Sequence, residues 1–246
     1  MKKIKIYSKA THPMSGQTSY SFEIFLFKCG LCLTSIQDIN SNLFTHLFCA
    51  FTDLDSTTYT VTISSANSAP FSQFTQTVQL KNPLVKTLLS ISGGASDEAA
   101  FSAMVSQASR RISFIDSSIT LTRTKGFHGL DIEWEYPGSN SDMTYLGTLL
   151  DEWQSAVVAK ATRFGKPPLL FMAAVQGYSP RVDGTYNYPY AAISRSLDWI
   201  NVITYDFYSP DWYTRFTNCH AVLYHPLWRG CQKHQNPELE ECGGAS

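Results

Sequence analysis

The sequence lacks any large excess of charge. Its 246 residues carry 19 Lys and Arg against 20 Asp and Glu, for a net charge of -1, and no basic block interrupts them. Proteins that bind nucleic acid or anionic membranes usually concentrate positive charge on one surface. We therefore expect neither nucleic acid nor a membrane as a partner.

Long hydrophobic runs are also missing. The longest apolar stretch in the first part of the chain, residues 22–33, contains Glu23 and Lys28. It is too short to cross a bilayer, which needs about 20 apolar residues, and it is a poor match to a signal peptide. The sequence has no N-x-S/T glycosylation acceptor, so glycosylation gives no information about the compartment.

The sequence also lacks a cysteine spacing that favours a metal site, although it has six cysteines. Cys29 and Cys32 have the two-residue gap of a zinc or redox pair, whereas ten residues separate Cys231 from Cys242. We predict no metal. The sequence leaves the possible disulfide bonds open.

The sequence does contain enough apolar residues for a full core, because 43% of them are hydrophobic. Continuous apolar runs begin near residues 43, 85, 127, 169 and 199, and four of these five starts are about forty residues apart. Helical patterns separate most of these runs, and they cover residues 70–81, 97–106, 110–125 and 141–164, the last expected to be capped by Ser141. This alternation predicts an α/β fold with a parallel sheet covered by helices.

Two architectures have this succession, the (β/α)8 TIM barrel and the doubly wound sheet. A doubly wound protein would be expected to carry G-x-G-x-x-G after an early strand, and the Ser-Gly-Gly turn at residues 92–94 does not supply it. We therefore predict a barrel domain over residues 35–226 and no cofactor. Residues 1–34 are expected to form an irregular leader with one strand at Glu23–Phe27, and residues 227–246 an unpatterned polar tail.

The stretch FHGLDIEWEYPG, residues 127–138, has an alternation typical of a strand. Successive strand side chains point to opposite faces, so three acids share one face and three large apolar residues share the other. The acids are Asp131, Glu133 and Glu135, and the apolar residues are Leu130, Ile132 and Trp134.

Two interpretations of this acidic row involve no catalysis: a solvated edge strand and a cation site. The large apolar residues on the other face weigh against both, because they indicate a strand that is covered and central. Closely spaced carboxyls in a covered strand repel one another, which keeps a carboxylic acid protonated near neutral pH. In a barrel, functional residues lie at the carboxyl ends of strands, where Glu135, Tyr205 and Asp206 fall.

Together these residues resemble glycoside hydrolase family 18, and most closely its plant class V chitinases. The family motif D-x-x-D-x-D-x-E falls on His128, Asp131, Glu133 and Glu135. Further matching blocks are LFTHLFCAF at 43–51, SFIDSSI at 113–119, PPLLFMAAV at 167–175 and LDWINVITYDFY at 197–208. The resemblance covers about residues 35–225.

The resemblance implies hydrolysis of β-1,4-linked N-acetylglucosamine polymers (chitin) by a substrate-assisted retaining mechanism, in which the acetamido oxygen of the sugar is the nucleophile. Glu135 would be the general acid that protonates the leaving oxygen. Glu133 would accept the acetamido N–H, Asp131 would set the charge of the row, and Tyr205 would donate its hydroxyl to the acetamido oxygen.

The resemblance also implies the substrate-binding residues and the setting of the protein. Asp206 would bind the sugar, and the loop aromatics Tyr208 and Trp212 would stack on sugar faces. The expected partners are chitin or N-acetylglucosamine oligosaccharides, bound by a monomer. By resemblance we expect an extracellular or vacuolar protein of plant defence.

The chain departs from the family pattern at three positions near the motif. His128 stands for the first Asp, Glu133 stands for the third Asp, and Ser92 stands for the first Gly of the family's S-x-G-G turn. The extra methylene of Glu133 moves its carboxylate by roughly 1.5 Å, in a site where about 1 Å of misplacement is costly. The alternative hypothesis is therefore a chitin-binding, lectin-like pseudoenzyme with weak or no catalysis.

The two ends of the sequence depart further. Nothing before Ser35 matches the family's first strand, and strands seven and eight of the barrel and the small inserted α+β domain have no counterpart. We therefore expect an incomplete, truncated barrel with open sheet edges. A third hypothesis is that such a fragment is not a stable protein.

Overall fold

The computed structural model describes residues 4–10, 20–27, 35–94, 97–176 and 186–203. The chain divides into two compact units, Met1–Val202 and Ile203–Ser246. The first unit contains the sheet and the helices described below. The predicted domain boundaries at residues 35 and 226 stay predictions.

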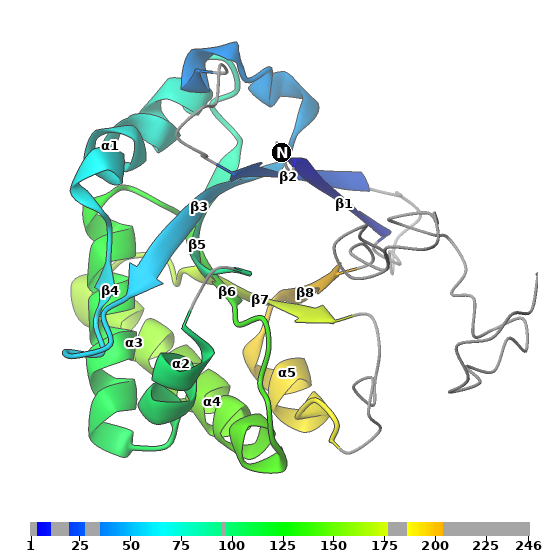
Figure 1. Cartoon of the computed structure of the whole chain (residues 1–246). Coiled ribbons are helices and arrows are strands. Elements are labelled where there is room, and N and C mark those ends of the chain that lie inside the picture. Colours follow the sequence, from blue (N-terminus) through cyan, green and yellow to red (C-terminus); the bar gives the residue numbers. More distant parts are fainter. Residues whose placement is uncertain (1–3, 11–19, 28–34, 95–96, 177–185, 204–246) are drawn as a thin grey trace, which may run out of the picture. The chain divides into compact units, whose positions relative to one another are not determined.

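One eight-stranded sheet forms the centre of the first unit, in the order β1-β2-β3-β5-β6-β7-β8, with β4 paired to β3 (Figure 1). From β2 to β7 the strands in this path are parallel, and the β1-β2 and β3-β4 pairs are antiparallel. The strands are β1 (Ile4–Ala10), β2 (Tyr20–Phe27), β3 (His46–Leu54), β4 (Val61–Thr62), β5 (Lys86–Ser92), β6 (Gly129–Glu133), β7 (Leu170–Gln176) and β8 (Trp199–Ile203). The predicted parallel sheet is confirmed.

The region expected to be an irregular leader contains two strands. The predicted strand at Glu23–Phe27 lies within β2, which is confirmed. The expectation of an otherwise irregular leader is wrong, because β1 pairs with β2 along its full length, from Ile4 opposite Leu26 to Ala10 opposite Tyr20. Its sequence, IKIYSKA, alternates too briefly to stand out without its partner strand.

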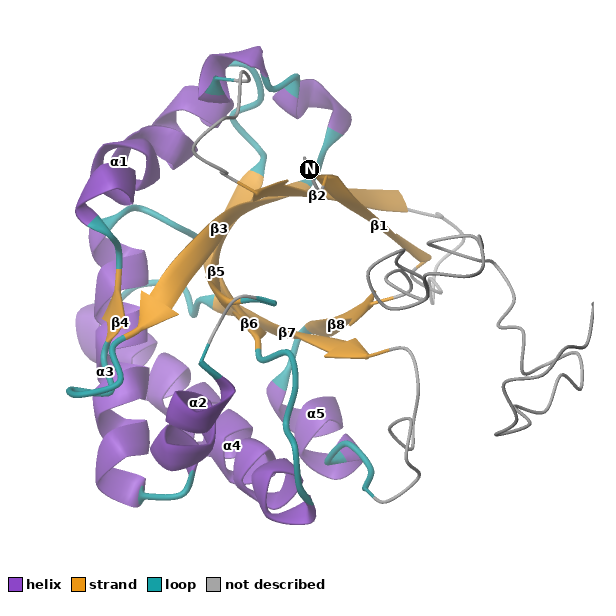
Figure 2. Ribbon diagram, viewed as in Figure 1, coloured by secondary structure: helices purple, strands orange, loops and turns teal. Residues whose placement is uncertain are grey.

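The helices lie on one side of the curved sheet (Figure 2). They are α1 (Ser65–Gln79), α2 (Glu98–Val105), α3 (Ala108–Thr124), α4 (Asn140–Phe164) and α5 (Tyr190–Ser196), with short 3-10 turns at Ile36–Asp38 and Ser41–Leu43. Every predicted helix is present. None of the helices in the described residues has the length and apolar character of a membrane span.

Two helix starts differ from the prediction. The cap of α4 is Ser139 rather than Ser141: its hydroxyl accepts the backbone N–H of Asp142 at 3.0 Å. Gly165, with φ 60°, ends this helix as expected. Helix α1 begins at Ser65, five residues before Pro70, which lies inside the helix, so proline did not mark the start.

The sheet is buried on both faces. On the helix side, Trp153 of α4 is fully buried between Phe114 of α3 and Phe171 of β7, with ring centroids 4.9 and 4.7 Å away. On the inner side, a smaller cluster contains Phe48, Ala50, Leu88 and Met172. Burial on both faces explains why these strands read as continuous apolar runs rather than alternating ones.

Strand β6 lies in the middle of this sheet, between β5 and β7. All five of its residues are buried. Leu130, Ile132 and the following Trp134 belong to the helix-side core, which places the acids on the inner face. The prediction that the acidic strand is covered and central is confirmed, and a solvated edge strand is excluded.

Candidate active site

The innermost acid, Asp131, is held by two neighbouring strands. It is fully buried, and it lies opposite Ser90 in the register of β5 and β6. The Ser90 hydroxyl donates to Oδ2 at 2.8 Å, and the Asn201 side-chain amide on β8 donates to Oδ1 at 3.1 Å. Both carboxylate oxygens therefore receive a hydrogen bond from a buried side chain.

Glu133, two residues further along β6, points to the same inner face and is fully buried. It lies opposite Ser92, the last residue of β5. Its backbone carbonyl accepts the N–H of Gly93 at 2.8 Å, which ties the end of β6 to the turn after β5. The second acid of the row therefore lies beside the Ser92-Gly93 turn.

Glu135 lies just past the carboxyl end of β6 and is half-buried. A Cβ atom added to Gly94 would lie 3.3 Å from the Glu135 Oε2 atom, so any larger residue at this position would crowd the carboxylate. Among the three acids, Glu135 is the one with access to solvent, whereas Asp131 and Glu133 have none. This arrangement suits a group that must exchange a proton with a bound molecule.

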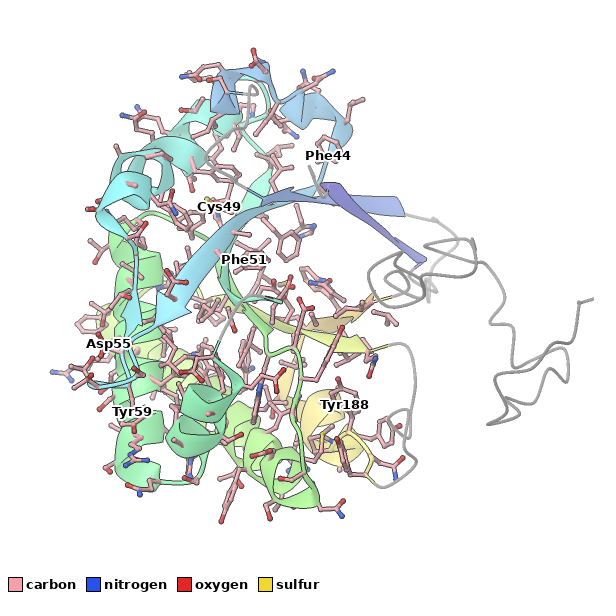
Figure 3. The ribbon with its side chains drawn as sticks, viewed as in Figure 1. Phe44, Cys49, Phe51, Asp55, Tyr59 and Tyr188 are labelled. Carbon is pink, nitrogen blue, oxygen red and sulfur yellow. The ribbon has the colours of Figure 1, made fainter. Side chains whose placement is uncertain are left out.

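The turn after β5 is built from an unusual backbone. Ser92 has φ 81° and Gly93 has φ 110°, both in the left-handed region that favours glycine. A Cβ atom on Gly93 would lie 2.8 Å from the ring of Phe51, on β3 (Figure 3), so only glycine fits there. The turn thus packs between Phe51 and the acidic strand.

His128, at the first position of the motif, lies at the opposite end of β6 from Glu135. The backbone N–H of Thr87 donates to its Nδ1 atom at 3.1 Å. Burial lowers the pKa of His128 from its ordinary value of 6.5, and the charges of Lys86 and Arg123 lower it further. This position therefore lies away from the acidic rim.

The remaining predicted site residues, Tyr205, Asp206, Tyr208 and Trp212, lie outside the described residues, and so do Cys29 and Cys32. Their roles stay predictions. Among the residues that the structure does describe, no cluster of His, Cys, Asp and Glu could hold a metal ion.

The sequence interpretation missed Ser90 and Asn201, the two donors to Asp131. Each is a buried polar residue on a strand of the sheet, exposed by 0% and 2% respectively. Such residues usually have a specific buried partner. That signal was available, but the partner could not be named without the register of the strands.

Comparison with known proteins gives a consistent result. The family model Glycosyl hydrolases family 18 matches residues 15–239. A class V chitinase of Arabidopsis thaliana is 56% identical over 191 residues, which are 78% of this chain and 50% of that protein. The chain spans about half the length of the curated relatives it matches.

Two solved structures resemble this chain over about four fifths of its length. The class V chitinase of Nicotiana tobaccum superposes with a TM-score of 0.76 at 52% identity, covering 79% of this chain and 56% of that one. The chitinase-like agglutinin RobpsCRA of Robinia pseudoacacia gives 0.75 at 52% identity, covering 79% and 58%.

The parallel strands, the outer helices and the acids at the end of β6 define part of a TIM barrel of the glycosidase type. The chain belongs to glycosyl hydrolases family 18, and plant class V chitinases are among its relatives. The predicted fold class and family are confirmed, with the barrel covered in part.

Proposed function

We propose that this protein hydrolyses β-1,4-linked N-acetylglucosamine polymers, with Glu135 as the general acid. The observation that carries the proposal is the position of Glu135: half-buried at the carboxyl end of β6, next in line after two fully buried acids. A mutant of the tobacco class V chitinase, 52% identical to this chain, was solved in complex with NAG4. A related protein therefore binds the kind of oligosaccharide that this site would bind.

The geometry supports a division of roles along the row. The acetamido oxygen of the substrate attacks the anomeric carbon, the bond to the leaving oxygen breaks, and Glu135 gives its proton to that oxygen. Glu133, buried just behind it, accepts the acetamido N–H as positive charge develops on the ring formed by the acetamido group. Asp131 stays in place through Ser90 and Asn201 and supplies fixed negative charge.

The proposal extends to four residues outside the described part of the chain. Tyr205 donates its hydroxyl to the acetamido oxygen, Asp206 binds the sugar, and Tyr208 and Trp212 stack on sugar faces. The family match reaches residue 239 and thus includes all four.

We also propose that the protein acts as a monomer on chitin or its oligosaccharides. By its relation to plant class V chitinases we place it in the extracellular space or the vacuole, in plant defence. Gel filtration of the full chain tests the first point, and a fluorescent fusion expressed in leaf cells tests the second.

The decisive experiment compares Glu135→Gln with Glu98→Gln on a chitin hexamer. Gln at position 135 keeps the size of the side chain and removes the proton, so turnover should fall by about 10²–10⁴-fold. Glu98 is an exposed acid in the first turn of α2, so its variant controls for the loss of one negative charge. Wild-type protein that is folded by circular dichroism but releases no sugar would refute the proposal.

A lectin-like role is the second candidate. Two observations favour it: Glu133 replaces the family's Asp, and a relative at 52% identity is a chitinase-like agglutinin. Under this hypothesis, calorimetry detects binding of the chitin hexamer to the wild-type chain, and the hexamer is not cleaved. Binding with turnover supports the hydrolase, and binding without turnover supports the lectin.

A further inference from the structure

The amide of Asn201 occupies an unusual position for a residue on β8. It is 2% exposed, and its Nδ2 atom lies 3.1 Å from Asp131 Oδ1 on β6, although β7 lies between these two strands. Neighbouring strands are about 4.8 Å apart, so a flat sheet would hold β6 and β8 about 10 Å apart. The contact therefore depends on the curvature of the sheet, which brings the inner side chains together.

Asn201 and Ser90 contact different oxygens of the same carboxylate. Ser90 donates to Oδ2 at 2.8 Å from β5, and Asn201 donates to Oδ1 from β8. Hydrogen bonds donated to both oxygens favour the ionised carboxylate and oppose its rotation. The two contacts therefore favour a negative charge on Asp131, at the base of the acidic row.

Three described side chains face Asp131 from the strands around it. Ser90, Met172 and Asn201 face it from β5, β7 and β8, and none of the three titrates near neutral pH. On its own strand, the next group on the same face is Glu133.

We propose that Asn201 is a positioning residue for hydrolysis: by holding Asp131 ionised, it leaves the proton of the row on the acids nearest the substrate. This inference rests on the proposed function. It assigns a role to a residue outside the acidic motif, through a contact that only the folded sheet creates.

A purely structural role for Asn201 makes a different prediction. If the amide only ties β8 to β6, its removal lowers the stability of the fold and leaves the pH dependence of turnover where it was. Asn82 provides a control, because its half-buried side-chain amide also donates to two distant groups, the carbonyls of Ser41 and Phe44 at 3.0 Å each.

The experiment measures kcat/KM on a chitin hexamer from pH 4 to 8 for wild type, Asn201→Leu, Asn201→Asp and Asn82→Leu. Leu removes the donor, so Asp131 takes up a proton more readily, and the acidic limb should move up by about one pH unit. Asp at 201 donates only while protonated, so activity should be lost as pH rises and the optimum should move to lower pH. Asn82→Leu should leave both limbs in place.

Opposite shifts for the two Asn201 variants support the proposal. If the pH profiles of both Asn201 variants coincide with those of wild type and Asn82→Leu, the proposal is overturned, whatever the change in stability. If Asn201→Leu does not fold, the direction of the Asn201→Asp shift decides alone.

A second measurement separates this inference from the proposed function. If wild type shows no turnover, the proposed function fails, but the carboxyl ¹³C signal of Asp131 can still be followed by NMR and assigned with Asp131→Asn. In wild type the signal should stay at its ionised position to a lower pH than in Asn201→Leu, by about one unit. Coincident titration curves in the two proteins overturn the inference.

Discussion

Ser92 on β5 lies directly opposite Glu133 on β6, and both side chains are buried. These are also two of the three positions at which the sequence departs from the family's pattern near the acids. Ser92 has φ 81°, a conformation in which any side chain with a Cβ atom is strained. Among the described residues its hydroxyl has no hydrogen-bond partner. The site therefore carries strain at the residue that faces its altered acid.

Replacing Ser92 with glycine should stabilise the protein. The substitution removes the Cβ strain and a buried hydroxyl that has no partner among the described residues, and we expect the free energy of unfolding to rise by about 1 kcal/mol. Urea denaturation followed by circular dichroism measures the change. Ser92→Ala is the control, because it removes the hydroxyl but keeps the Cβ atom. An equal gain in both variants would mean that the hydroxyl, and not the backbone, is the source of the strain.

Shortening Glu133 to Asp should raise turnover if the extra methylene misplaces its carboxylate. Glu133 is fully buried, and a misplacement of roughly 1.5 Å in a catalytic group is costly, so the shorter acid should raise kcat by about tenfold or more. Initial rates on a chitin hexamer measure this. The double variant with Ser92→Gly tests whether the two facing positions are coupled, since independent sites give multiplicative effects. An unchanged kcat in Glu133→Asp would show that the longer acid is already well placed.

Two glycines should separate activity from stability. A Cβ atom on Gly94 would lie 3.3 Å from Glu135 Oε2, so Gly94→Ala should displace the carboxylate and lower turnover about tenfold, with little loss of stability. A Cβ atom on Gly129 would lie 2.8 Å from the backbone oxygen of Leu170, so Gly129→Ala should destabilise the fold by about 1–3 kcal/mol. Thermal melts and hexamer assays on both variants provide the comparison. Equal losses of stability would contradict the assignment of Gly94 to the site.

Much of the fold could be predicted because its strands are buried on both faces. Residues 169–175 are continuously apolar and residues 43–51 are mostly so, and the helices between the strands have clear periods and caps. Strand β1 could not be predicted, because it depends on pairing with β2 rather than on a pattern of its own. The start of α1 was placed at Pro70 because proline is favoured in a first turn, yet the helix begins at Ser65.

The acidic row could also be found in the sequence, because alternation fixes which residues share a face. The residues that hold Asp131 in place could not be found in this way. Ser90 and Asn201 are 41 and 70 residues away from it, and they meet it through strand register and sheet curvature. The strain at Ser92 was likewise hidden, because φ is a property of the folded turn and not of the residue type.

The neutral side chain of His128, just before β6, accepts a hydrogen bond from the start of β5. Its Nδ1 atom accepts the N–H of Thr87, and it lies within 3.1 Å of the Thr87 hydroxyl as well. A protonated ring would place a hydrogen on Nδ1 and lose the bond from the Thr87 N–H. Burial, Lys86 and Arg123 all oppose the added charge, so the pKa of His128 lies below 6.5 in the folded protein.

Stability should therefore fall as the pH is lowered through about 6.5. In the unfolded chain His128 takes up a proton near pH 6.5, whereas in the folded protein it does so only at lower pH, so the unfolded state binds more protons in that window and is favoured. The loss should level off below the pKa of the folded state. Asn at position 128 keeps an acceptor for the Thr87 N–H but does not titrate, so its urea midpoint should match wild type at pH 8 and exceed it at pH 5. Parallel midpoints for the two proteins across that range would show that His128 is not the source of any acid sensitivity.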